Sequence, residues 1–229
     1  VVKINGYNPQ PGDVKFKDLR PDGVINAGDN TVDNPGDRKI IGNDAARYQF
    51  GISLGASYKG WSLEVLLQGV GKRDYWLGGP AMFPFGGAGA GDAVFQALYA
   101  NQTDYWRAKS YDPSSSDYMV PVNPDSKLFR IYDQGNNVGS NTRVSDKYLQ
   151  NAAYMRIKNI TLAYTLPKEW VKRAFIQDAK FYLSIENLAT FSSLPKGYDP
   201  EGTAPSSTAN ALSNGISWGY PYYRTISLG

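Results

Sequence analysis

The stretch from residue 47 to residue 72 reads RYQFGISLGASYKGWSLEVLLQGVGK and has the pattern of two strands joined by a tight turn. Between residues 48 and 58, aromatic or apolar residues occupy the even positions and small or polar residues occupy the odd ones. This alternation is typical of a strand with one apolar and one polar face. Lys59-Gly60 predicts a two-residue turn. The alternation then resumes at Trp61 and continues to Leu67, with Leu66 as the exception.

Both predicted strands are longer than the five or six residues of an average strand. A tilted strand needs roughly 9–11 residues to cross the apolar core of a bilayer. Membrane barrels also carry aromatic residues at both interfaces. Tyr58 and Trp61 beside the turn, and Tyr48 at the other end, fit these positions. A soluble β-sandwich or a lipocalin-like barrel has the same alternation and stays open as an alternative.

Composition favours an all-β chain and excludes several kinds of function. The 229 residues include 24 Gly and no Cys, so a disulfide scaffold and thiol chemistry are excluded. A formal net charge of +3 gives no basic footprint for binding nucleic acid. The sequence has no apolar run of about 18 residues that predicts a transmembrane helix. Because no signal-peptide pattern opens it, we expect a mature chain or a part of a longer one.

The sequence contains no His. Ser-His-Asp catalysis, His general bases and His metal ligands are therefore excluded. The 21 acidic residues are scattered, and no two of them stand out as a catalytic pair. We expect a protein that is not an enzyme.

Residues 1–45 are polar and rich in turns, and they contain a pattern similar to a calcium-binding loop. Such loops place oxygen ligands around a sharp turn at Gly, with an acidic residue at the end. The candidate ligands are Asp18, Asp22, the carbonyl of Val24, Asn26 and Asp29. Gly23 takes the turn position, whereas Arg20 brings a positive charge to a ligand position. The alternative is an Asx-rich turn held by its own side chains.

Three more strands are predicted by alternation, over residues 154–167, 179–191 and 222–229. Residues 168–175 predict one or two turns of helix. Arg156 and Lys158 occupy even-numbered positions, as do the apolar residues of one face, such as Ile160 and Leu162. They are therefore expected at the rim of the sheet, unless a bulge near Asn159 resets the register.

Two long connections separate the predicted strands, over residues 73–152 and 192–220. Connections of this length are uncommon in compact domains unless they are functional. The first contains aromatic residues of the kind that interfaces use as anchors. They are Tyr75, Trp76, Tyr105 and Trp106. The alternative is that these rings pack the loop itself.

Several blocks of sequence, in this order, resemble the SusC/RagA family of TonB-dependent outer-membrane transporters. The blocks are PGDVKFKDLRPDGVINAGD at 11–29, IIGN at 40–43, the quoted stretch continued to Trp76, YMRIKNITLAYTLP at 154–167, FYLSIENLATFS at 181–192, KGYDPE at 196–201 and YPYYRTISLG at 220–229. They extend over nearly the whole chain, so the resemblance is specific.

The resemblance implies the C-terminal strands of a large transmembrane antiparallel barrel in the outer membrane, which has 22 strands in known members of this family. It further implies a SusD-like lipoprotein as a lid and the TonB-ExbB-ExbD complex as the source of energy. No plug and no TonB box are present in this sequence. The domain organisation we expect is an extracellular loop at 1–45, followed by barrel strands at 46–229 whose long loops, 73–152 and 192–220, also face outside.

The function predicted is therefore uptake of glycan or peptide fragments, with a polar strand face lining the lumen. The lumen candidates are Gln49, Ser53, Ser57, Ser62, Glu64, Gln68, Tyr182 and Glu186. Their alternative role is to line the wall or to bond to a plug. A transporter-like barrel with a structural or assembly role, and a soluble glycan-binding β domain, are the alternative functions.

Overall fold

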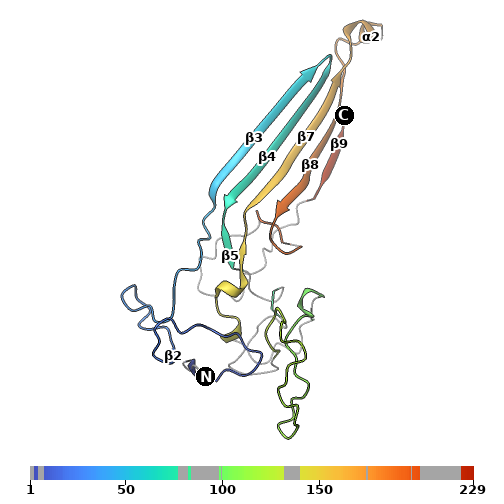
Figure 1. Ribbon diagram of the computed structural model, residues 1–229. Coiled ribbons are helices and arrows are strands. Elements are labelled where there is room, and N and C mark those ends of the chain that lie inside the picture. Colours follow the sequence, from blue (N-terminus) through green and yellow to red (C-terminus); the bar gives the residue numbers. More distant parts are fainter. Residues whose placement is uncertain are drawn as a thin grey trace. The chain divides into compact units, whose positions relative to one another are not determined.

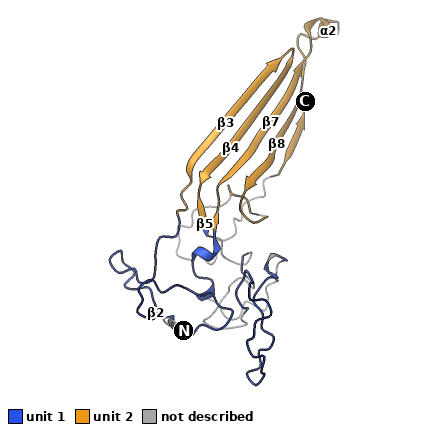
Figure 2. Cartoon of the chain, in the orientation of Figure 1, with its two compact units in different colours: residues 1–42, 76–149, 206–216 blue, residues 43–75, 150–205, 217–229 orange. Residues whose placement is uncertain are grey.

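The computed structural model describes residues 3–4, 8–76, 82–83, 98, 100–131, 140–173, 175–196, 198–201 and 223–229. The chain divides into two compact units, shown in different colours in Figure 2. Unit 1 comprises residues 1–42, 76–149 and 206–216, and unit 2 comprises residues 43–75, 150–205 and 217–229. Regular structure in the described residues is mostly β, which confirms the all-β prediction.

Unit 2 is built on one antiparallel sheet of five strands, which lie side by side in Figure 1. The strands are β3 (Arg47–Tyr58), β4 (Trp61–Lys72), β7 (Tyr154–Thr165), β8 (Lys180–Ser192) and β9 (Thr225–Leu228), in that spatial order. Each of the five was predicted from alternation. The turn between β3 and β4 is also confirmed: Lys59 and Gly60 have φ angles of 46° and 86°, as a type I′ turn requires.

The register of the sheet places most large apolar residues of neighbouring strands on the same face, with Leu66 and Val70 among the exceptions. One cross-strand row consists of Tyr58, Trp61, Tyr164 and Phe181, and another of Leu54, Val65, Ile160, Ile185 and Ile226. The side chains of this face are half-buried or exposed. Leu54 is 55% exposed and Ile226 63% exposed. The sheet thus presents a continuous apolar surface that nothing in unit 2 covers among the described residues.

A β-bulge interrupts β7 at Lys158. Leu67 of β4 pairs with Ile157 and Leu66 pairs with Asn159, so Lys158 is an extra residue in the ladder. The pairing of β7 with β8 shifts at the same place, where Asn187 has a φ of 51°. The predicted bulge near Asn159 is therefore confirmed. Its consequence is that Arg156 lies on the polar face, beside Gln68.

The connection between β7 and β8 contains the short helix α2 (Lys168–Lys172), where one or two turns of helix were predicted. The amide of Thr165 donates a 2.8 Å hydrogen bond to the carbonyl of Gly60. This contact places α2 and the β3–β4 turn at the same end of the sheet, as Figure 1 shows.

Unit 1 has little regular structure: two short parallel strands, β1 (Lys3–Ile4) and β2 (Val24–Ile25), and the 3-10 turns η3 (Ala100–Gln102) and η4 (Asp146–Tyr148). Its core is a cluster of buried side chains, Val14, Phe83, Leu128, Phe129 and Tyr148. The short strands β5 (Asp74–Trp76) and β6 (Leu149–Asn151) pair with each other where the chain passes between the units.

Buried polar side chains tie distant segments of unit 1 together. Asn141 accepts a hydrogen bond from the amide of Val14 at 2.8 Å and donates one to the carboxylate of Asp13, also at 2.8 Å. The segment around Asp13 and Val14 is therefore attached to the long connection that follows β5. Among the described residues, no helix has both the length and the hydropathy needed to cross a membrane.

Candidate functional site

The polar face of the sheet brings together all eight lumen candidates. Ser57 pairs with Ser62 and Ser53 with Leu66, while Gln49, Glu64 and Gln68 occupy the same face by register. Ala163 pairs with Ser62 on one side and with Tyr182 on the other, and Asn159 pairs in the same way with Leu66 and Glu186. Tyr182 and Glu186 therefore lie on this face too. Leu66, the exception in the alternation, is the apolar side chain that interrupts this polar surface.

A small cross-strand network stands at the centre of the polar face. The side chain of Thr161 donates to Asn159 at 2.9 Å, and its hydroxyl also lies 2.9 Å from the hydroxyl of Ser184. Asn159 in turn donates to Ser184 at 3.1 Å. These bonds hold the side chains of β7 and β8 in fixed positions, so this part of the wall is pre-organised.

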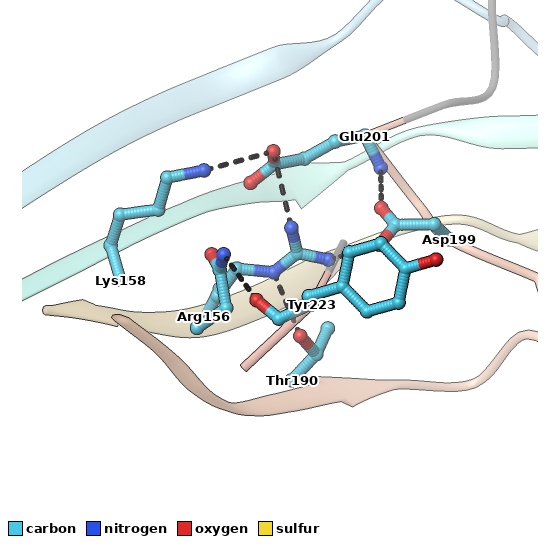
Figure 3. A network of polar contacts seen from close by, with 7 residues as sticks. Arg156, Lys158, Thr190, Asp199, Glu201 and Tyr223 are labelled. Carbon is cyan, nitrogen blue, oxygen red and sulfur yellow. Dashed lines mark hydrogen bonds and ion pairs between the residues drawn. The ribbon is translucent and has the colours of Figure 1, made fainter. Parts of the chain in front are cut away.

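Arg156 is the most completely buried charged residue of the described chain, with 1% of its surface exposed. Its guanidinium contacts Asp199 at 2.6 Å and Glu201 at 3.2 Å, and its Nε donates to Thr190 at 2.8 Å (Figure 3). Lys158, the bulge residue, reaches the same carboxylate of Glu201 at 3.2 Å. Two basic residues of β7 thereby hold the segment 198–201 against the polar face.

Residues 223 and 224 hold the irregular part of β8 at Asn187 and Leu188 by hydrogen bonds. Asn187 donates a 3.1 Å hydrogen bond to the carbonyl of Tyr223, and Arg224 donates a 2.8 Å hydrogen bond to the carbonyl of Leu188. Residues 198–201 and residues 223–224 are thus both attached to the sheet near the bulge.

This network was missed by sequence reasoning, although its signals were present. Arg156 and Lys158 stood out because their parity conflicted with an apolar face. Asp199 and Glu201 lie within the KGYDPE block that carried the family resemblance. The spacing of these residues along the sequence does not predict that two basic residues of a strand contact carboxylates some forty positions later.

The four aromatic candidates of the long connection are packed within the chain. Tyr75 is 5% exposed and Trp106 is 7% exposed. Trp76 and Tyr105 pack against the core cluster of unit 1, where the ring of Trp76 lies 5.9 Å from that of Phe83, centroid to centroid, in a tilted arrangement. This burial favours the alternative in which the rings pack the loop, and contact with a partner stays a prediction.

In the calcium-like loop, most of the candidate ligands bond to their own backbone. Asp18 accepts from the amide of Gly23, Asp22 from that of Val24, and Asn26 from that of Gly28, at 2.7–2.9 Å. One oxygen of Asp18, Oδ1, is buried and has no hydrogen-bond partner among the described residues. Within the same residues, no three acidic side chains come together as a metal site. Binding of calcium stays a prediction.

Asp29, expected to close this loop, instead accepts a 2.7 Å hydrogen bond from Asn34. The carboxylate that organises the loop belongs to Asp37, which the sequence analysis did not select. It accepts hydrogen bonds from the amides of Asn26, Leu19 and Arg20 at 2.8–3.1 Å. These bonds, the one from Asn26 first, lower the pKa of Asp37 below its ordinary value against the opposing effect of burial.

The Arg156 network generates a prediction about stability. Arg156→Met removes the charge but keeps a long apolar stem, and it leaves the carboxylates of Asp199 and Glu201 partly buried without their main partner. Breaking a buried ion pair costs about 3–5 kcal/mol. We expect a corresponding drop in the urea midpoint of unfolding for the full protein that contains this chain.

The matched control is Lys109→Met, which breaks the ion pair with Asp117. That pair is 3.7 Å long, and both side chains are more than half exposed. Exposed pairs contribute about 0–1 kcal/mol, so this variant should unfold close to the parent. Equal midpoints for the two variants would show that the Arg156 network does not stabilise the fold.

Comparison with known proteins finds TonB-dependent receptors among the relatives of this chain, and no family model matches it. TonB-dependent receptor P3 of Formosa agariphila is 26% identical over 224 residues, which is 96% of this chain and 19% of that receptor. TonB-dependent receptor P26 of the same organism is 23% identical over 220 residues, 95% of this chain and 19% of that receptor. A structure of the RagAB peptide transporter aligns with 67% of this chain and 14% of its own, at 22% identity and a TM-score of 0.41.

The chain therefore spans about a fifth of the length of the curated relatives that it matches. The match extends along almost the whole of this chain, as did the sequence blocks that carried the resemblance. The predicted resemblance to TonB-dependent receptors is thereby confirmed, and the chain is similar to one part of such a receptor.

Proposed function

We propose that this chain forms the C-terminal strands of the barrel of a SusC/RagA-type transporter in an outer membrane. The observation that carries the proposal is the two-faced sheet, with an exposed apolar face along all five strands and a polar face opposite. A soluble protein rarely leaves so large an apolar patch uncovered. A bilayer covers such a face without cost, which favours the membrane barrel over a soluble glycan-binding domain.

In this proposal the polar face lines the lumen of a barrel that further strands complete. The tight β3–β4 turn and the short β7–β8 connection lie on the periplasmic side, because membrane barrels have short turns there and long loops outside. The long connections after β4 and β8 then lie on the extracellular side. The Arg156 network would hold the start of the second connection to the inside of the wall.

The activity proposed is TonB-dependent uptake of glycan or peptide fragments, without chemistry on the substrate. A SusD-like lipoprotein would cover the extracellular side, and TonB-ExbB-ExbD would act through another part of the same transporter. The support is the family resemblance of the sequence blocks and the similarity to TonB-dependent receptors over 96% of the chain. The polar lumen face offers hydroxyl, amide and carboxylate groups that suit such substrates.

The membrane face is tested by a pair of neighbouring substitutions in β3. Ile52 belongs to the apolar face and Ser53 to the polar face, at the middle of the strand. Arg at a lipid-facing position near the bilayer centre costs about 2–4 kcal/mol, whereas a lumen position tolerates it. We expect Ile52→Arg to lower the stability of the folded protein in vesicles by this amount and Ser53→Arg to have little effect.

The measurement is urea-dependent folding of the full protein into vesicles of phosphatidylcholine. Equal tolerance of Arg at residues 52 and 53 would contradict the proposed membrane face. Because the two positions are adjacent in one strand, they lie at nearly the same depth and on opposite faces of the sheet.

We also propose that the loop around Gly23 binds Ca²⁺, which the buried and unpartnered Oδ1 of Asp18 supports. Calcium should then slow proteolytic cleavage of the full protein within residues 18–38, relative to a chelator. Asp18→Asn should abolish this difference, since it weakens a charged oxygen ligand. Asp33→Asn, on an exposed part of the same segment, should retain it. Equal cleavage of the parent protein with calcium and with chelator would contradict the site.

A further inference from the structure

The connection between β7 and β8 exposes apolar side chains that no element of unit 2 covers among the described residues. Phe175 is 99% exposed, Trp170 is 64% exposed and Ile176 is 48% exposed. Phe175 also has a φ of 58°, which a bulky residue rarely adopts. Only Val171 of α2 is turned into the protein, with 4% of its surface exposed.

Basic residues occur at the same end of the sheet as these exposed side chains. They are Lys59 in the β3–β4 turn and three residues of the α2 segment, Lys168, Lys172 and Arg173. The acidic residues there are Glu169 and Asp178. None of these four basic residues forms an ion pair within the described part of the chain, whereas Arg156 and Lys158 at the other end are paired.

The apolar face continues up to this basic end. Its last row consists of Tyr58, Trp61, Tyr164 and Phe181, and the rings of Trp61 and Tyr164 lie 4.7 Å apart. An open apolar hollow of about 610 Å³ lies beside this row. Its lining consists of Trp61, Leu162, Tyr164, Phe181, Leu183 and Leu228 of the apolar face, with Tyr182 and Gly229.

We propose that this end of the sheet is a binding site for anionic phospholipid, with an acyl chain in the hollow and the headgroup phosphate on the basic residues. The arrangement matches the two parts of such a lipid, an apolar chain and a negative headgroup, in the right order along the strands. Exposed aromatic residues beside a cluster of Lys and Arg are typical of a surface that lies at a bilayer interface. The inference rests on the proposed insertion of the sheet into a membrane.

The test uses the full protein in nanodiscs of phosphatidylcholine, into which spin-labelled phosphatidylglycerol or spin-labelled phosphatidylcholine is added. Electron paramagnetic resonance measures the fraction of each lipid immobilised on the protein. Each basic residue near an anionic surface raises affinity about fivefold. We expect the parent to prefer phosphatidylglycerol and the triple variant K168Q/K172Q/R173Q to lose most of that preference, at least about tenfold.

The matched control is K15Q/K17Q/K39Q, which removes the same charge from three exposed residues of unit 1. It should keep the preference of the parent. An equal loss of preference in both triple variants would overturn the proposed lipid site, because the preference would then depend on net charge alone. A parent protein without any preference for phosphatidylglycerol would overturn it as well.

A second measurement reports on Phe175 without altering the basic residues. The chain has no Cys, so Phe175→Cys gives it one labelling position, and Val32→Cys, at a residue that is 97% exposed in unit 1, gives the control. A fluorescent label at 175 should be quenched by lipids that carry a nitroxide on the headgroup, several-fold more than a label at 32. Equal quenching would overturn the site. Failure of the parent to insert into the bilayer at all would instead overturn the proposed function, which separates the two ideas.

Discussion

The sheet of unit 2 depends on one extra residue in β7. Without the bulge at Lys158, Arg156 would share the apolar face with Ile160 and Leu162, and a charged side chain without a partner is unfavourable on an apolar face. The bulge reverses the alternation of β7 at this point. Ile157 and Ile160 therefore lie on the apolar face, and Arg156 and Asn159 lie on the polar face. Arg156 then reaches Thr190, Asp199 and Glu201 on the polar face. A local change in backbone register thus decides where a buried charge lies and which loop it holds.

The sequence predicted the parts of this fold that depend on near neighbours. Alternation from Tyr48 to Tyr58 predicted β3 and its two faces, and Lys59-Gly60 predicted the turn, because side-chain direction and turn type are set within a few residues. The conflict at Arg156 even indicated the bulge. All eight lumen candidates lie on one face for the same reason.

The contacts that sequence analysis missed join residues far apart in the chain. Arg156 and Asp199 meet only because β8 and its following segment fold back along β7. Asp37 organises the calcium-like loop from a position beyond the expected Asp29, since the intervening residues form a turn of their own. The burial of Trp106 against Gly12 likewise depends on packing between the N-terminal segment and the long connection. Local patterns carry no information about such pairings.

Unit 1 shows how a long connection with little regular structure in its described residues can be ordered. Backbone groups that lack a ladder partner still need hydrogen bonds when water is excluded. Here side chains supply them: Asn123 bonds to the backbone of Arg107 and Tyr105, and Gln102 bonds to the carbonyl of Phe83.

The two units therefore satisfy the hydrogen-bonding groups of their backbones in different ways. In the sheet, ladders satisfy the backbone of the inner strands and leave the side chains free to form two faces. At the edges, β3 and the short β9 leave backbone groups without a ladder partner among the described residues. In the apolar part of a bilayer each unsatisfied group costs several kcal/mol. A sheet whose apolar face lies in lipid must therefore pair both edges with further strands, from the same polypeptide or another, and closure into a barrel is the arrangement that leaves no edge.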